Sequence, residues 1–126
     1  MKTFLLLFVI LFGENLVAQE WKFITKSANG SEYYFKPNTL KTAWTKQVSP
    51  QTAYYEKGQK KIVDGYNLTL WKFDCENKKI GVVQQNTYNS DGELLNTFTL
   101  KEYEIELTYV VPDTIGENLI NAFCSN

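Results

Sequence analysis

The chain has 126 residues, which is enough for one compact domain with a hydrophobic core but short for two. Its residues are 44% hydrophobic and 15% aromatic, which is typical of a folded, sheet-prone chain and not of a disordered one. The formal net charge is −1, and all thirteen basic residues are lysines. With neither a positive field nor arginine side chains to read phosphates or base edges, the chain is not expected to bind nucleic acid.

The N-terminus is typical of a secretory signal peptide. Lys2 supplies a positive charge, an unbroken apolar run covers residues 4–12, and Ala18 is a small residue at which cleavage can take place. The apolar run is too short for a membrane anchor, because about 20 apolar residues are needed to cross a bilayer. We therefore expect an exported protein with a signal peptide over 1–18, a single domain over 19–126 and no transmembrane segment in the mature chain.

The first part of the mature chain predicts a β-hairpin and a third strand. Trp21 and Phe23 alternate with polar residues, and the pair at 29–30, Asn-Gly, tolerates the positive φ of a tight turn. Residues 41–49 predict the next strand.

Residues 49–61 lose this alternation and collect proline, glycine and charge, so we expect them to form the longest loop. Where two tyrosines are adjacent in an extended backbone, one of them points away from the core, and tyrosine is favoured at protein-binding surfaces. This loop therefore supplies the candidate binding surface. Its residues are Tyr54, Tyr55, Lys57, Lys60 and Lys61.

Three further strands are predicted between residues 64 and 100. The first, 64–74, ends at the polar turn 76–79. The other two, 80–88 and 93–100, are joined by the turn sequence Asn-Ser-Asp-Gly and predict a second hairpin.

Residues 101–110 have the most regular two-residue period in the chain, which predicts a half-buried strand. The face expected to be buried consists of Tyr103, Ile105, Leu107 and Tyr109. The face expected to be in solvent consists of Glu102, Glu104, Glu106 and Thr108. Carboxylates at this spacing are candidates for acid/base catalysis or cation binding, but charges on the wet face of a strand usually serve solubility and edge protection. We therefore expect these glutamates to be surface charges.

The C-terminal segment predicts one helix of roughly ten residues, which would need packing to be stable. Ile115, Leu119 and Phe123 recur at helical spacing, and Thr114 with Glu117 fits a capping box. The chain as a whole predicts an α+β fold, in which an antiparallel sheet of about six strands is covered by one C-terminal helix.

Cys75 and Cys124 are the two cysteines of the chain. In an exported protein their simplest state is a disulfide, which would tie the end of the helix to the sheet. A metal site or a catalytic thiol would call for histidine or further cysteines, and the sequence contains no histidine.

The sequence also lacks the motifs of common enzymes. It has no arginine, no Gly-x-Ser-x-Gly motif, no P-loop and no glycine-rich dinucleotide turn. We therefore expect a non-enzymatic protein with no catalytic residues, no metal and no cofactor.

Several segments together resemble the bacterial surface-adhesin protein E family. They are WKFI, YYF, PNTL, AWTK, FDCENKKI, NTYNSDGELL and YVVPDTIGENLINAFC. The most specific are the Asp-Cys pair followed by a basic turn, the hairpin with a glycine turn, and the proline that precedes a final helix ending in cysteine. The resemblance covers nearly the whole mature chain. It implies an antiparallel sheet with a C-terminal helix, tied to it by the disulfide between Cys75 and Cys124.

The resemblance also implies a function. Members of the family bind host extracellular-matrix and serum proteins, and some form dimers. By this resemblance the chain is an exported binding protein in the periplasm, on the outer surface or secreted, with extracellular protein partners and the ability to form a homodimer. It departs from the family in lacking a lipid-attachment cysteine and in having Tyr109 where members often have tryptophan.

A second hypothesis is a periplasmic module that binds a small apolar or aromatic ligand between helix and sheet. A large internal cavity would favour this alternative.

Overall fold

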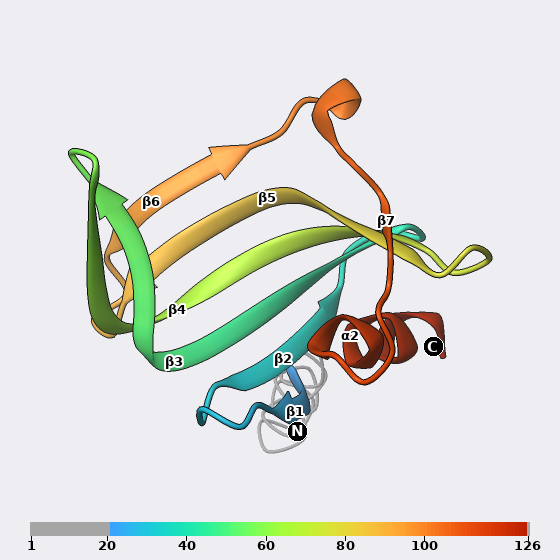
Figure 1. The fold of residues 1–126 in the computed structure, drawn as a ribbon, viewed down its shortest axis with the longest axis horizontal. Coiled ribbons are helices and arrows are strands. Elements are labelled where there is room, and N and C mark those ends of the chain that lie inside the picture. Colours follow the sequence, from blue (N-terminus) through green and yellow to red (C-terminus); the bar gives the residue numbers. More distant parts are fainter. Residues whose placement is uncertain (1–20, 126) are drawn as a thin grey trace, which may run out of the picture.

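The computed structural model describes residues 21–125, so the signal peptide expected over 1–18 lies outside the described residues. The elements in chain order are β1 (Lys22–Lys26), β2 (Glu32–Pro37), β3 (Thr42–Glu56), β4 (Gln59–Asp74), β5 (Lys79–Asn89), β6 (Leu94–Thr99), the 3₁₀ helix η1 (Glu102–Glu104), β7 (Thr108–Tyr109) and α2 (Ile115–Cys124). Strands β1 to β6 form an antiparallel meander in sequence order, and β7 pairs with β5 (Figure 1). The predicted α+β fold, with six main strands and one C-terminal helix, is confirmed.

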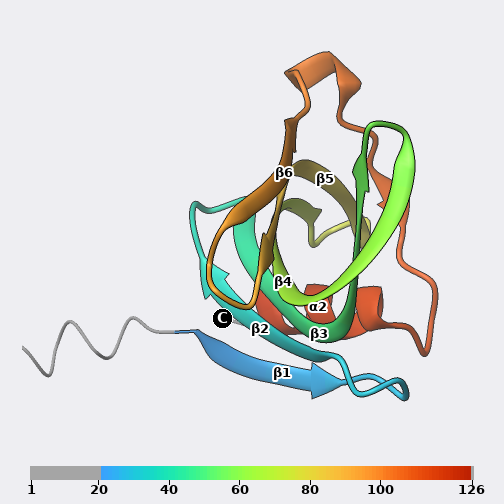
Figure 2. The same cartoon turned by 90° about the vertical axis from the view of Figure 1, so that its left-hand side faces the viewer.

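The sheet is strongly curved, and two features of β3 and β4 bend it. The register between the two strands shifts between Ser49 and Thr52. On β4, Gly65 allows an unusually close approach of β5, because a Cβ at this position would lie 2.1 Å from the backbone oxygen of Tyr88. The outer half of the β3–β4 hairpin therefore curls toward the side of the sheet that carries α2, and this side is concave (Figures 1 and 2).

The hydrophobic core lies between α2 and the concave face. Phe35 of β2, Ala43 of β3 and Phe73 of β4 are buried there. From the helix, Leu119 and Ile120 pack against them, and both are buried. The helix that the three- and four-residue spacing predicts thus turns its apolar stripe toward the sheet.

The predicted disulfide is present. The sulfur atoms of Cys75 and Cys124 are 2.07 Å apart and their Cα atoms 5.7 Å apart. Cys75 lies in the turn after β4, and Cys124 is the last residue of α2. The bridge therefore ties the end of the helix to the sheet, as expected.

The prediction of a long loop over 49–61 is wrong. Strand β3 runs to Glu56 and β4 starts at Gln59, so this segment is a β-ribbon with a tight turn. Lys57 and Gly58 form the turn with φ angles of 51° and 80°. The sequence pattern failed here because the register shift in β3 interrupts the two-residue period and accommodates a proline within a strand.

The prediction of a strand over 101–110 is also wrong for most of the segment, which forms η1 and only the two-residue β7. The side chains of Tyr103 and Tyr109, expected to be buried, are 81% and 72% exposed. The reason is that β6 already occupies most of the free edge of β5. The segment pairs with β5 only at Lys79 and Ile80.

The helix begins where the sequence predicts, with Thr114 as its N-cap, but the capping box does not form. The Thr114 hydroxyl instead donates to the carbonyl oxygen of Val111 at 2.7 Å. The Glu117 carboxylate accepts from the backbone N–H of Asp113 at 3.3 Å. Both side chains therefore stabilise the turn before the helix.

Candidate functional site

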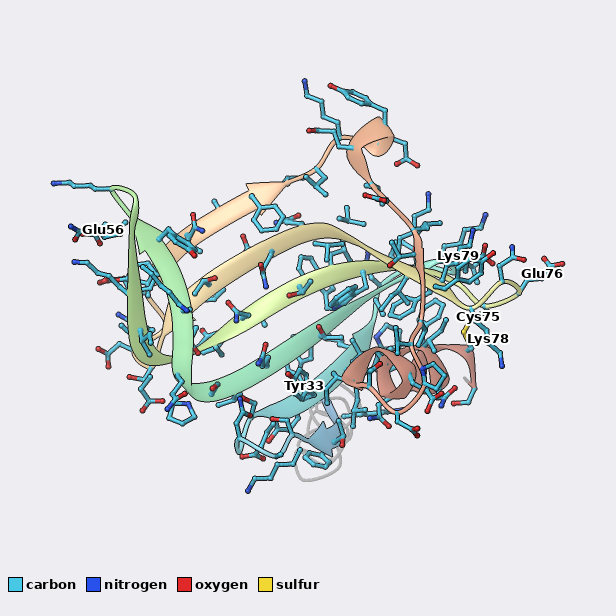
Figure 3. All side chains as sticks on the ribbon, viewed as in Figure 1. Tyr33, Glu56, Cys75, Glu76, Lys78 and Lys79 are labelled. Carbon is cyan, nitrogen blue, oxygen red and sulfur yellow. A yellow bond between two sulfur atoms is a disulfide. The ribbon has the colours of Figure 1, made fainter. Side chains whose placement is uncertain are left out.

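The tip of the β3–β4 ribbon and a groove on the concave face are two candidate binding features of the fold. The tip lies far from the disulfide, as shown by the positions of Glu56 and Cys75 at opposite ends of the molecule (Figure 3). Among the described residues, β2 pairs with β3 only as far as Val48, and β5 pairs with β4 only from Gly65 onward. Beyond these positions the ribbon has no strand partner on either edge within residues 21–125.

The outer face of the ribbon carries exposed apolar side chains. Tyr55 pairs with Lys60, and Ala53 pairs with Ile62, so these four side chains share one face. Tyr55 is 65% exposed and Ile62 is 60% exposed. Tyr55 and Lys60 belong to the set predicted from the sequence, whereas Ile62 does not. If the turn at 57–58 had been recognised, the two-residue alternation of side chains along the strand after it would have placed Ile62 on the same face as Lys60.

The other predicted residues of the candidate surface lie elsewhere on the tip. Tyr54 pairs with Lys61 on the opposite face of the ribbon, and Tyr54 is half-buried. The Lys61 ammonium lies 3.5 Å from the Glu56 carboxylate. Lys57 is in the turn. The structure therefore gathers the five predicted residues at one end of the molecule but divides them between two faces.

The second feature is a groove of about 340 Å³, which we call the Trp71 groove. One part of the edge of β5 pairs with β6 and another part pairs with β7, and the groove lies near the point where these two pairings meet. Its apolar wall and acidic rim are formed by Trp71, Ile80, Val82, Leu100, Glu104 and Glu106. The sequence offered no signal for this groove, because its lining comes from β4, β5 and the segment after β6, which are separate in the sequence.

Two contacts fix the shape of the Trp71 groove. The Trp71 indole N–H donates to the hydroxyl oxygen of Thr45 at 2.7 Å, which holds the ring in one orientation. Gly81 lets the segment after η1 lie close to β5, because a Cβ there would be 2.5 Å from the backbone oxygen of Glu106. The groove is therefore built into the fold by a hydrogen bond and a close backbone approach.

The three glutamates that sequence analysis interpreted as surface charges differ in their surroundings. The Glu102 carboxylate lies 3.0 Å from the Lys72 ammonium, outside the groove. The Glu104 carboxylate accepts from the backbone N–H of Lys101 at 2.9 Å. Glu106 forms no hydrogen bond or ion pair with any described residue. All three are exposed, and the last two line the groove.

Part of the concave face carries polar side chains from β4 and β5. Thr69 and Thr87 are buried, and both form hydrogen bonds across strands. The Gln85 side-chain amide donates to the Thr69 hydroxyl oxygen at 3.3 Å, and the Thr87 hydroxyl donates to the Asn67 carbonyl oxygen at 2.7 Å. Cross-strand bonds thus satisfy these buried hydroxyl groups.

Titratable groups with shifted pKa values lie outside the groove and the ribbon tip. Burial raises the pKa of the Tyr33 hydroxyl. A hydrogen bond from the Tyr34 hydroxyl to the Glu32 carboxylate, 2.9 Å long, raises the pKa of that hydroxyl. Hydrogen bonds from Asn77 hold the pKa of the Asp74 carboxyl below its ordinary value. In the described part of the chain, no three His, Cys, Asp or Glu side chains are placed to hold a metal ion.

Aromatic side chains fill the interface between the last turn of the helix and the sheet. The Phe123 ring packs on Phe73 and meets Phe35 edge-on, with the ring centroids of the second pair 6.4 Å apart. At the edge of this interface, a pocket of about 400 Å³ lies between β1, β2 and α2, with Ile24, Phe35 and Asn118 among its lining residues. This pocket is where the small ligand of the alternative hypothesis would bind.

The class of protein that these features define is a curved antiparallel sheet with one disulfide-tethered helix, a β-ribbon that extends past the neighbouring strands, and a surface groove. The model of the surface-adhesin protein E family matches residues 21–125, and the chain belongs to this family. Comparison with curated proteins gave no match, and neither did comparison with solved structures. No helix within 21–125 is long and apolar enough to cross a membrane.

Proposed function

We propose that the chain is an exported, non-enzymatic adhesin that binds host extracellular-matrix or serum proteins. The observation that carries this proposal is the family match over 21–125, which covers the sheet, the helix and the disulfide together. Export through the signal peptide over 1–18 would leave one domain over 19–126. The disulfide supports export, because disulfides persist in oxidising compartments and are rare in the cytosol.

The tip of the ribbon is the surface that we propose for the partner. Tyr55 and Ile62 place two large exposed side chains on one face, and tyrosine offers rigid amphipathic contact area. Lys60 lies on this face, Lys57 is in the turn and Lys61 lies on the opposite face, and their positive charge would speed association with an acidic partner. The predicted set of Tyr54, Tyr55, Lys57, Lys60 and Lys61, with Ile62 added, is therefore the candidate contact region.

The experiment measures binding of the oxidised protein to immobilised matrix and serum proteins. The double variant Tyr55→Ala with Ile62→Ser should bind at least about tenfold more weakly, which is about 1.4 kcal/mol of binding free energy. Its melting temperature should stay unchanged, because both side chains are exposed. Tyr103→Ala is the matched control, since Tyr103 is 81% exposed and lies on η1, away from the ribbon.

Changing Lys57, Lys60 and Lys61 to Ser should slow association, and the effect should shrink as salt is added. The proposal fails if the parent protein binds none of the matrix or serum proteins. The ribbon assignment fails if the double variant binds as well as the parent while the fold is intact.

A further inference from the structure

We propose that the Trp71 groove binds the guanidinium group of an arginine side chain on a partner protein. The proposal deepens the proposed function, on which it rests for the existence of a protein partner. It assigns a chemical class of contact to a groove whose lining includes no residue of the ribbon tip.

The wall of the groove suits an aliphatic stem that ends in a planar cation. Ile80, Val82 and Leu100 supply apolar surface, and each is half-buried. The indole of Trp71 lies among them in an orientation fixed by its 2.7 Å hydrogen bond to Thr45. Tryptophan is the aromatic side chain that attracts cations most strongly, and arginine is its commonest partner in such contacts.

The charge of the groove favours a cation. Glu104 and Glu106 are its charged lining residues, and both are acidic. Glu106 has no partner among residues 21–125, and Glu104 uses one oxygen to accept from a backbone N–H. Two carboxylates beside an aromatic ring therefore leave an uncompensated negative charge at the rim.

The lysines near the groove are engaged elsewhere. The Lys72 ammonium pairs with Glu102 at 3.0 Å. The ammonium groups of Lys79 and Lys101 lie over the rings of Tyr109 and Tyr103, at 4.5 and 5.9 Å from the ring centroids. The described lysines therefore do not neutralise the two carboxylates at the rim.

Arginine fits this combination better than lysine. A guanidinium is planar and can stack on the indole while its N–H groups form paired hydrogen bonds to a carboxylate. A lysine ammonium is a compact, strongly hydrated charge that does not stack. The chain itself contains no arginine, so a second copy cannot supply the group, and the partner is a different protein.

The test uses a small probe and no partner protein. N-acetyl-arginine amide is added to the ¹⁵N-labelled oxidised protein, and its binding is followed by NMR. The Trp71 indole N–H and the backbone N–H groups of Val82 and Leu100 should shift in a saturable way. N-acetyl-citrulline amide has nearly the same shape without the charge, and it should cause little or no shift at these positions.

Variants then test the carboxylates. Glu104→Gln combined with Glu106→Gln should weaken binding of the arginine probe about tenfold, because both charges at the rim are lost. Glu106→Gln alone should weaken it less, and it leaves the hydrogen bond of Glu104 in place. Glu93→Gln is the matched control, and it should bind as the parent does, since the Glu93 side chain is exposed and does not line the groove.

The proposal is overturned if citrulline and arginine probes shift the same resonances equally. It is also overturned if the shifts lie outside the groove, or if the double variant with intact fold binds the probe unchanged. These outcomes are separate from those of the proposed function. If the protein binds the arginine probe but no matrix or serum protein, the groove proposal stands and the proposed function fails. If it binds a matrix or serum protein but not the arginine probe, the proposed function stands and the groove proposal fails.

Discussion

Phe123 stacks on Phe73, with ring centroids 4.3 Å apart and ring planes 12° apart. Close to this stack along both elements, Cys75 and Cys124 form the disulfide. The last turn of α2 is thus held to the end of β4 by an aromatic contact and a covalent bond. Both act on a helix of ten residues, which is too short to be stable without packing.

Replacing Phe123 by Ala should lower the free energy of unfolding by about 3 kcal/mol, because a ring packed between two others is lost from the core. Urea denaturation of the oxidised protein measures the change. Phe98→Ala is the control, since Phe98 lies on β6 and is 42% exposed. It should cost about 1 kcal/mol or less. Equal losses from the two variants would contradict the assigned role of Phe123.

Removing the disulfide should lower stability by about 4 kcal/mol. By the chain-entropy model this is the value for a loop that closes 49 residues. The measurement compares the parent with the double variant Cys75→Ser, Cys124→Ser by thermal and urea denaturation. Mass spectrometry of protein purified from the cell envelope should show no free thiol. Two free thiols in that material would contradict the bridge.

Two glycine-to-alanine changes should have opposite signs. Gly81→Ala should destabilise the protein, because the new Cβ would lie 2.5 Å from the backbone oxygen of Glu106 and push the segment after η1 away from β5. Gly116→Ala should stabilise it by up to about 1 kcal/mol, since alanine is the better helix former. The nearest atom there is a methyl carbon of Ile80 at 3.4 Å. Melting temperatures of both variants give the signs, and a stabilising Gly81→Ala would exclude the close approach.

Asp74 should contribute stability that depends on pH. The side-chain amide and backbone N–H of Asn77 donate to its carboxylate at 2.9 and 3.1 Å, which lowers its pKa in the folded state. The stabilisation is therefore fully present above the ordinary carboxyl pKa of about 3.9 and is lost as the pH falls through the lower folded-state pKa. As the pH falls from about 6 to about 2, the free energy of unfolding of Asp74→Asn should decrease less than that of the parent.

The free energy of unfolding of Asp74→Asn is measured between about pH 6 and about pH 2 and is compared with that of the parent and of Glu76→Gln. Glu76 is the next acidic residue along the chain. Parallel curves for the parent and Asp74→Asn would show that the hydrogen bonds of Asn77 do not affect stability.

The sequence by itself determined the features that depend on local chemistry. The glycine of the Asn29-Gly30 pair takes a positive φ of 89° in the turn between β1 and β2, as the pair predicts. The three- and four-residue apolar spacing from Ile115 to Phe123 specified the helix and its buried side. With two cysteines, only one intramolecular bridge was available. These signals also carried the family resemblance, and the family match confirmed it.

Only the tertiary structure decided which secondary structure residues 49–61 and 101–110 adopt. The first became a ribbon because a register shift let the strands continue past a proline, and such a shift depends on how β3 faces β4. The second has an ideal strand period, yet a strand needs a free edge to pair with. Because β6 already covers most of the edge of β5, the second segment crosses the sheet end instead and brings Glu104 and Glu106 to the Trp71 groove. Edge occupancy is a property of the assembled sheet, so no local pattern in the sequence encodes it.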